Sequence, residues 1–163
     1  MSRLIATVFG VGGPYKGAGT VGSAFALPFA WGLHQLGGPT LFIMATIATA
    51  IIGWYATRAY IQDKTDHDPT EVVIDEVVGQ WIALWPVSIG AAHVGADILA
   101  LWPGWVAAFV GFRFFDILKP WPVSIGDRRN DAFGVMLDDV IAGFLAAVLV
   151  VLLAGMAHGF LMG

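Results

Sequence analysis

Two pairs of adjacent carboxylates stand inside otherwise apolar stretches of this sequence. Asp75 and Glu76 interrupt the first stretch. Asp138 and Asp139 interrupt the second, which has the composition of a membrane helix. An unpaired charge within such a helix costs about 2.5–3.5 kcal/mol, so a metal ion or Arg113 should lie beside Asp138 and Asp139, and metal binding is the leading functional interpretation of Asp75 and Glu76. The chain has no cysteine and no histidine pair at ligand spacing. Carboxylates alone favour Mg²⁺ over Zn²⁺ as the bound metal.

A glycine-rich segment near the start of the chain could bind a phosphate. Residues 16–23 read Lys-Gly-Ala-Gly-Thr-Val-Gly-Ser, which places the hydroxyls of Thr20 and Ser23 close to the ammonium group of Lys16. Backbone N–H groups in such a turn can cradle an anion. The segment is not a Walker motif, and a flexible turn with a lone lysine is the alternative interpretation.

A third cluster places two cations and a carboxylate at a spacing of three residues. Arg113, Asp116 and Lys119 should share one face of a helix, which Pro120 and Pro122 should then end. In the functional interpretation Asp116 orients Arg113, and the two cations hold a phosphate. The alternative is a pair of internal salt bridges.

The clusters together carry more negative than positive charge. The positive residues are Lys16, Arg113 and Lys119. The negative residues are Asp75, Glu76, Asp116, Asp138 and Asp139. One divalent cation would balance the difference of −2.

The elements that carry these clusters should be membrane helices. Of the 163 residues 58% are hydrophobic and 12% are charged, and the mean hydropathy is +0.77. Stretches long enough to cross a bilayer are residues 21–36, 41–59, 77–94, 98–115 and 133–157. A soluble bundle is the alternative, but residues 41–59 hold a single charge, at Arg58. We therefore expect an all-α, polytopic membrane helical bundle of about five spans, with residues 1–163 as one domain.

A shorter apolar run, residues 4–11, cannot cross a bilayer and ends in glycines. We expect it to form an interfacial or re-entrant segment. A further helix should start near residue 68, with Asp68 as N-cap, Pro69 at the first helical position and Glu71 completing a capping box.

With five spans, the charged residues fall almost entirely on one side of the bilayer. All eight basic residues and eleven of the twelve acidic residues lie on the side of the N-terminus, and Asp97 is the exception. By the positive-inside rule that side faces the cytoplasm. The net charge of −4 and the lack of a basic run argue against nucleic acid as a partner.

Four segments in this order resemble the phosphatidylglycerophosphatase A family of bacterial membrane phosphatases. They are residues 16–28 (KGAGTVGSAFALP), 68–79 (DPTEVVIDEVVG), 112–122 (FRFFDILKPWP) and 134–143 (GVMLDDVIAG). The resemblance implies Mg²⁺-dependent removal of the terminal phosphate from the phospholipid phosphatidylglycerophosphate, which yields phosphatidylglycerol in the inner (cytoplasmic) membrane. It implies that functional residues fall on Lys16, Thr20, Asp75, Glu76, Arg113, Asp116, Lys119, Asp138 and Asp139.

These residues suggest a metal-assisted hydrolysis. The metal ligands would be Asp75, Glu76, Asp138 and Asp139, and the phosphate-binding residues Lys16, Thr20, Ser23, Arg113 and Lys119. Either Asp139 or Glu76 would be the general base. The catalytic set would therefore be Lys16, Thr20, Glu76, Arg113, Asp116 and Asp139. A covalent aspartyl phosphate is the rival route.

Two other functions remain possible on the residues alone. Intramembrane carboxylates also mark the ion paths of transporters, although such a path needs polar groups through the depth of the bilayer, and here the outer half has only Asp97. The second possible function is that of a lipid phosphotransferase acting on the same membrane face.

Overall fold

The chain folds into a bundle of helices, most of them apolar. The computed structural model describes residues 1–62, 64, 69–129 and 131–162. The helices are α1 (Ser2–Ala6), α2 (Ala18–Ile61), α3 (Ile74–Val94), the 3₁₀ helix η1 (Ile98–Leu101), α4 (Trp102–Leu118), α5 (Ser124–Asp127) and α6 (Ala132–Met162). Within the described part of the chain, α2, α3, η1 together with α4, and α6 are long and apolar enough to cross a membrane. The predicted all-α membrane bundle is confirmed.

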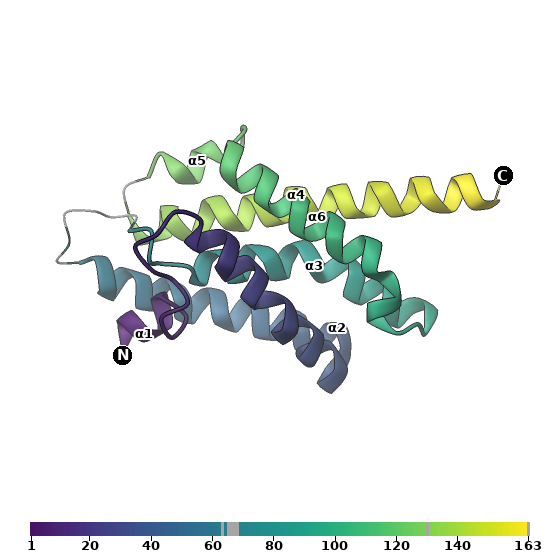
Figure 1. Ribbon diagram of the computed structural model, residues 1–163, viewed down its shortest axis with the longest axis horizontal. Coiled ribbons are helices and arrows are strands. Elements are labelled where there is room, and N and C mark those ends of the chain that lie inside the picture. The colour runs from purple at the N-terminus through teal and green to yellow at the C-terminus, as the bar shows by residue number, and fades with distance from the viewer. Residues whose placement is uncertain (63, 65–68, 130, 163) are drawn as a thin grey trace.

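The longest helix, α2, consists of two arms. Its 44 residues would extend about 66 Å if straight, twice the thickness of a bilayer core. The backbone is not helical at Gly37 and Gly38, and Gly38 has φ +63°, a conformation that favours glycine. Pro39 then begins the second arm, where a missing N–H is harmless. The arms, residues 18–36 and 39–61, run back along each other (Figure 1), so the described helices agree with about five spans.

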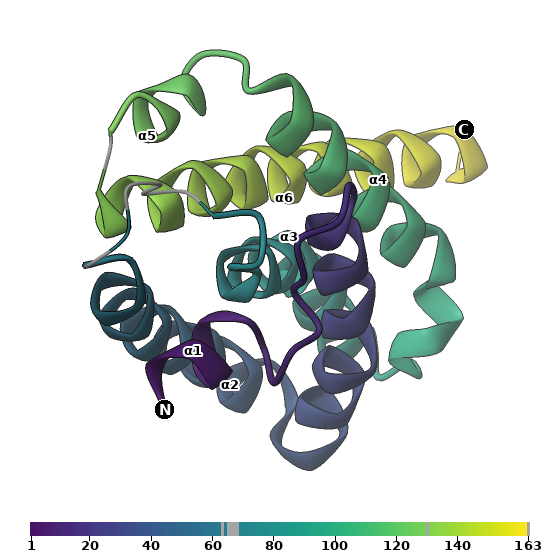
Figure 2. The same ribbon diagram turned by 60° about the vertical axis from the view of Figure 1, so that its left-hand side comes forward.

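Helix α3 lies at the centre of the bundle, with the two arms of α2 on one side and α6 on the other (Figure 2). The indole N–H of Trp81 donates to the Ala26 carbonyl, 2.9 Å away on the first arm. On another face, a side chain at Gly79 would lie 2.7 Å from the backbone oxygen of Asp139, and Gly143 packs against Gly79 itself. Glycine therefore permits the close approach of α3 and α6 that brings their carboxylates together.

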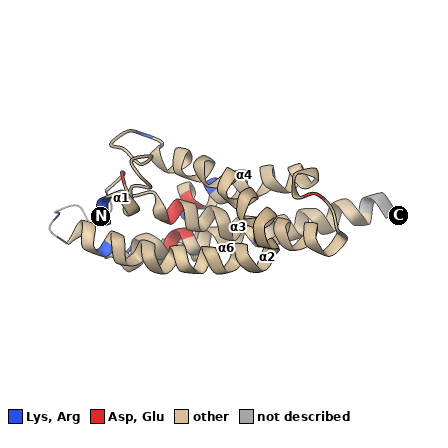
Figure 3. Ribbon diagram, turned by 90° about the horizontal axis from the view of Figure 1, so that it is seen from below, with Lys and Arg blue, Asp and Glu red and all other residues tan. Residues whose placement is uncertain are grey.

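The topology gathers the charged segments at one end of the bundle. The first arm of α2 starts there, α3 starts there, α4 ends there and α6 starts there. Figure 3 shows Lys, Arg, Asp and Glu concentrated toward that end, while Asp97 caps η1 after the far end of α3. The end of α1 is held there too, because the Ala6 carbonyl accepts a hydrogen bond from the backbone N–H of Val73, 3.0 Å away.

Two local predictions have different outcomes. The prediction of a helix starting near residue 68 is wrong, because α3 begins at Ile74; Asp68 itself lies outside the described residues. Glu71 does not complete a capping box but accepts hydrogen bonds from Lys64 and Tyr60, each 2.7 Å away. The N-terminal run forms only the short helix α1 followed by turns, and its position relative to a membrane stays a prediction.

Candidate active site

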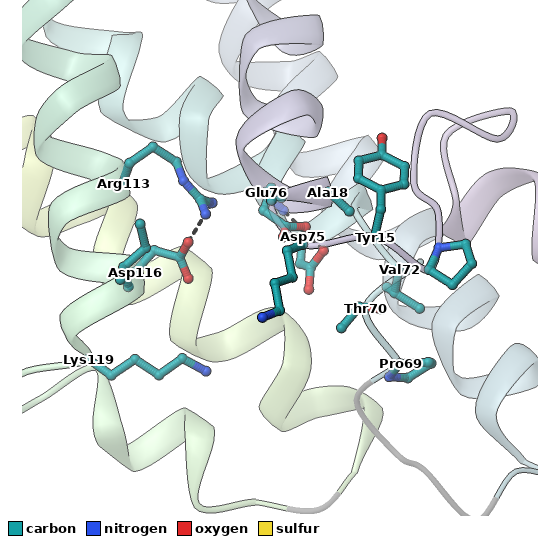
Figure 4. Close-up of a pocket in the computed structure, with 15 residues that line it drawn as sticks. Tyr15, Ala18, Pro69, Thr70, Val72, Asp75, Glu76, Arg113, Asp116 and Lys119 are labelled. Atoms are coloured by element: carbon teal, nitrogen blue, oxygen red, sulfur yellow. Dashed lines mark hydrogen bonds and ion pairs between the residues drawn. The ribbon is translucent and has the colours of Figure 1, made fainter.

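A pocket of about 510 Å³ opens at the charged end of the bundle. Its walls come from the loop before α2, the loop before α3, the first turn of α3 and the last turns of α4 (Figure 4). The charged residues that line it are Lys16, Asp75, Glu76, Arg113, Asp116 and Lys119. Residues from three separate segments of the sequence, 14–19, 69–76 and 113–119, thus meet around one space.

Three carboxylates gather beside this pocket. Asp75 and Glu76 in α3 and Asp139 in α6 each offer an oxygen, and the three oxygens lie within 4.8 Å of one another. Glu76 Oε2 and Asp139 Oδ2 are buried and have no hydrogen-bond partner among the described residues. Buried carboxylates at this separation repel one another unless a cation lies between them, and hard divalent cations prefer oxygen ligands. The cluster could hold a metal ion.

The side chains of Asp138 and Asp139 point in different directions. Successive residues of an α-helix point about 100° apart, so two adjacent carboxylates do not face the same point. Asp138 Oδ2 accepts a hydrogen bond from Lys119 Nζ, 2.9 Å away, and Asp138 is not one of the three gathered carboxylates. The role of Asp138 as a metal ligand stays a prediction, with this pairing as its structural alternative.

Arg113 lies on the opposite wall of the pocket and is held by two groups. Its NH1 is 2.5 Å from Asp116 Oδ2 and 3.5 Å from the hydroxyl of Ser23. A Cβ at Gly19 would lie 3.1 Å from Arg113 NH1 and would clash with Glu76 Oε1. The absence of a side chain at Gly19 therefore leaves the space in which Glu76 and Arg113 approach each other.

Lys119 connects three helices at the edge of the pocket. It follows α4 in a left-handed conformation with φ +46° and bonds to Asp127 of α5 and Asp138 of α6. Burial alone would lower the pKa of Lys119, but the hydrogen bonds to Asp127 and Asp138 outweigh burial and raise the pKa above its usual value. Lys119 therefore remains a cation while it joins the helix ends.

The glycine-rich segment places its three predicted residues in different environments. Lys16 is exposed and lines the pocket. Thr20 is exposed on α2 and is not one of the lining residues. Ser23 is buried, donates to the Gly19 carbonyl 2.8 Å away, and faces Arg113. Binding of phosphate by each of the three stays a prediction.

Several residues of the site were not predicted from the sequence. Tyr15, Thr70 and Ile117 line the pocket. They are neutral residues in loops or at a helix end, and only the three-dimensional arrangement identifies them. Asp127, the second partner of Lys119, could have been found from the sequence, because it is a charged residue close to the prolines that follow α4.

Comparison with known proteins gives consistent matches over most of the chain. The family model of phosphatidylglycerophosphatase A matches residues 4–154. The chain is 36% identical over 150 residues to phosphatidylglycerophosphatase A of Haemophilus influenzae, covering 91% of this chain and 85% of that protein. It is 35% identical over 147 residues to phosphatidylglycerophosphatase A of Escherichia coli, covering 89% and 78%.

A third relative has a different name. The Bacteroides thetaiotaomicron protein named "Putative phosphatidylinositol-3-phosphatase" is 33% identical over 153 residues, covering 90% of this chain and 89% of that protein. No solved structure matches the chain. These relatives give no support to the transporter alternative, since all three have names of phosphatases. The family model and the identities show that the chain belongs to the phosphatidylglycerophosphatase A family of phosphatases.

Proposed function

We propose that this protein hydrolyses the terminal phosphate ester of phosphatidylglycerophosphate and releases phosphatidylglycerol and inorganic phosphate. One observation carries the proposal: the carboxylates of Asp75, Glu76 and Asp139 lie beside a pocket that Arg113 and Lys16 also line. Carboxylates that can hold a cation, next to cationic side chains, form a site for a phosphate group. The names of the Haemophilus and Escherichia relatives support this substrate.

The proposed location is the bacterial inner membrane, with the pocket facing the cytoplasm. The pocket lies at the end of the bundle where the basic residues of the chain concentrate (Figure 3). Basic residues favour the cytoplasmic side of a membrane protein. A phospholipid whose acyl chains remain in the bilayer would present its terminal phosphate near that surface.

The proposed cofactor is Mg²⁺, held by Asp75, Glu76 and Asp139. The structure supports a hard cation here, because all the gathered ligand atoms are carboxylate oxygens, and Glu76 and Asp139 each have a buried oxygen without a hydrogen-bond donor among the described residues. When bound, Mg²⁺ would polarise the phosphoryl group and lower the pKa of water. The remaining chemistry belongs to side chains of the protein.

Arg113 would hold the phosphoryl oxygens with its guanidinium group, and Asp116 would fix the orientation of Arg113. Lys16 would add a second positive charge at the mouth of the pocket. Water would form a bond to phosphorus as the bond from phosphorus to the glycerol oxygen breaks. Glu76 or Asp139 would accept a proton from the water and pass a proton to the glycerol oxygen, which leaves as a hydroxyl.

The rival route passes through a phosphorylated carboxylate of the protein. Rapid acid quenching with substrate labelled in the terminal phosphate separates the two routes. Direct attack by water leaves the protein unlabelled throughout the first turnover. A labelled protein that loses its label at the rate of turnover would contradict direct attack.

The substrate is tested with purified protein in detergent, Mg²⁺, and either phosphatidylglycerophosphate or phosphatidylinositol 3-phosphate. We expect phosphatidylglycerol, identified by mass spectrometry, from the first lipid at a kcat/KM at least about tenfold above that for the second. The second lipid is included because of the name of the Bacteroides relative. A preference for the inositol lipid would contradict the proposed substrate.

A further inference from the structure

A buried glutamine lies one helical turn deeper in the bundle than Glu76. Gln80 in α3 has no exposed surface, and neither Oε1 nor Nε2 has a hydrogen-bond partner among the described residues. A buried amide without a partner is unfavourable, and buried polar groups in proteins nearly always have one. A hydrogen-bond partner for Gln80 should therefore lie close to it.

The packing of α3 shows which way Gln80 faces. Glu76, four residues earlier, lies against Gly19 of α2 and Arg113 of α4. Val87, seven residues later, packs against Gly104 of α4, where a Cβ would lie 3.0 Å from Val87 Cγ2. Residues four and seven apart share a helix face. Gln80 therefore points into the seam between α4 and the first arm of α2, directly below Glu76.

The partner that this geometry offers is Glu76 itself. Glu76 Oε2 is buried and lacks a hydrogen-bond donor among the described residues, whereas the Gln80 amide is a donor without an acceptor. Side chains four residues apart on a helix are within reach of each other.

We propose that Gln80 is a positioning residue that orients Glu76: its amide N–H binds Glu76 Oε2 and so fixes the carboxylate beside the cation site. This inference rests on the proposed cation site. Partners that hydrogen-bond a ligating carboxylate typically change metal affinity 10- to 100-fold when removed. Gln80 thus extends the site one turn below the residues that line the pocket.

The informative variant is Gln80→Met, which keeps the length of the side chain and removes both hydrogen-bonding groups. If the amide only fills space, removing an unpartnered buried amide should stabilise the protein and leave cation binding unchanged. If Gln80 orients Glu76, Mn²⁺ should bind at least about tenfold more weakly while the thermal midpoint stays the same or rises. Mn²⁺ binding to the full-length protein in detergent is measured by electron paramagnetic resonance.

Thr57→Val provides a matched control. Thr57 on the second arm of α2 is also fully buried, and its hydroxyl also lacks a partner among the described residues, but it is not a residue of the pocket. Thr57→Val should raise the thermal midpoint and leave Mn²⁺ binding within about twofold of wild type. Equal loss of Mn²⁺ affinity in both variants would show a general effect on the bundle and would overturn the proposal.

A double-mutant cycle with Glu76→Gln tests the coupling directly. In the Glu76→Gln background, Gln80→Met should change Mn²⁺ affinity by less than about twofold, because the carboxylate that it orients is gone. If the two substitutions weaken Mn²⁺ binding independently, so that the double variant shows the product of the two single losses, the proposal is overturned. Wild-type Mn²⁺ affinity in a folded Gln80→Met protein would also overturn it, with Gln80→Leu as the replacement if the methionine variant does not fold.

The Mn²⁺ measurement contains no lipid, so it separates this inference from the proposed substrate. Suppose that Gln80→Met weakens Mn²⁺ binding only when Glu76 is present, but the wild-type protein releases no phosphate from phosphatidylglycerophosphate. That result would support the role of Gln80 and contradict the proposed substrate. A wild-type protein that binds no Mn²⁺ would overturn the cation site and the role of Gln80 together.

Discussion

Arg113 and Asp116 form an ion pair on α4, with 2.5 Å between NH1 of the arginine and Oδ2 of the aspartate. Both side chains lie across the pocket from Asp75 and Glu76 (Figure 4). A carboxylate one turn away therefore holds one nitrogen of the guanidinium group in place. In the proposed mechanism, this pair would hold Arg113 in the orientation in which it binds a phosphoryl group.

Replacing Arg113 by lysine should lower kcat/KM for phosphatidylglycerophosphate by about 100-fold. Lysine keeps the charge but lacks the planar fork that binds two oxygens at once, and loss of one aligned donor typically lowers kcat 10²- to 10³-fold. Arg129→Lys is the control, since Arg129 is exposed and pairs with Asp131 away from the pocket. Unchanged kinetics in Arg113→Lys would show that the guanidinium does not bind the phosphate.

Removing charge from the carboxylate cluster should change the dependence of activity on Mg²⁺. Asp75→Asn, Glu76→Gln and Asp139→Asn should each raise the Mg²⁺ concentration for half-maximal rate at least about tenfold, because each removes an anionic ligand. Asp97→Asn, at the other end of the bundle, should behave as wild type. Unaltered Mg²⁺ curves for the three cluster variants would exclude them as ligands.

Asp138→Asn should mainly affect stability. Asparagine keeps an acceptor oxygen but lacks the negative charge that pairs with Lys119, and weakening this charged hydrogen bond at a largely buried site costs about 1–3 kcal/mol of unfolding free energy. The Mg²⁺ concentration for half-maximal rate should stay within about twofold of wild type. A tenfold increase would instead make Asp138 a ligand, as the sequence suggested. Denaturant titration in detergent and Mg²⁺ titration of the rate distinguish the two outcomes.

The Lys64–Glu71 pair should contribute stability that depends on pH. Hydrogen bonds from Lys64, and then from Tyr60, lower the pKa of Glu71 below its ordinary value of 4.5. A lowered carboxyl pKa gives stability that is complete above the unfolded-state pKa and is lost as pH falls through the folded-state pKa. The contribution should be under about 1 kcal/mol, because the pair is partly exposed.

This prediction is checked by comparing unfolding of wild type and Glu71→Gln at several pH values. The difference between them should be constant from about pH 5 to neutral pH and should shrink as pH falls below 4.5. A difference that grows on acidification would have the wrong sign for this pair.

Hydropathy predicted the helices well because a membrane span needs a long apolar stretch whatever its neighbours are. The gathering of Asp75, Glu76 and Arg113 at one end followed from counting spans. The prediction at Glu71 failed because a capping-box pattern depends only on local spacing, whereas Glu71 binds Lys64 and Tyr60 of the segment before it. Local sequence does not contain that contact.

The separation of Asp138 from Asp139 shows a second limit. The sequence identifies both as charges inside a membrane helix, but which one faces α3 depends on the rotation of α6. The contact of Gly143 with Gly79 accompanies the rotation that turns Asp139 toward α3. The sequence does not identify Gln80 for a related reason. A neutral amide indicates no function until its burial and its lack of a hydrogen-bond partner among the described residues are known.

The most direct test of the central claim is the initial rate of phosphate release from phosphatidylglycerophosphate by the purified protein in detergent micelles. The account predicts release in the presence of Mg²⁺, loss of release when EDTA removes the cation, and recovery when Mg²⁺ is restored in excess. No release at any Mg²⁺ concentration, or an equal rate in EDTA, would contradict it.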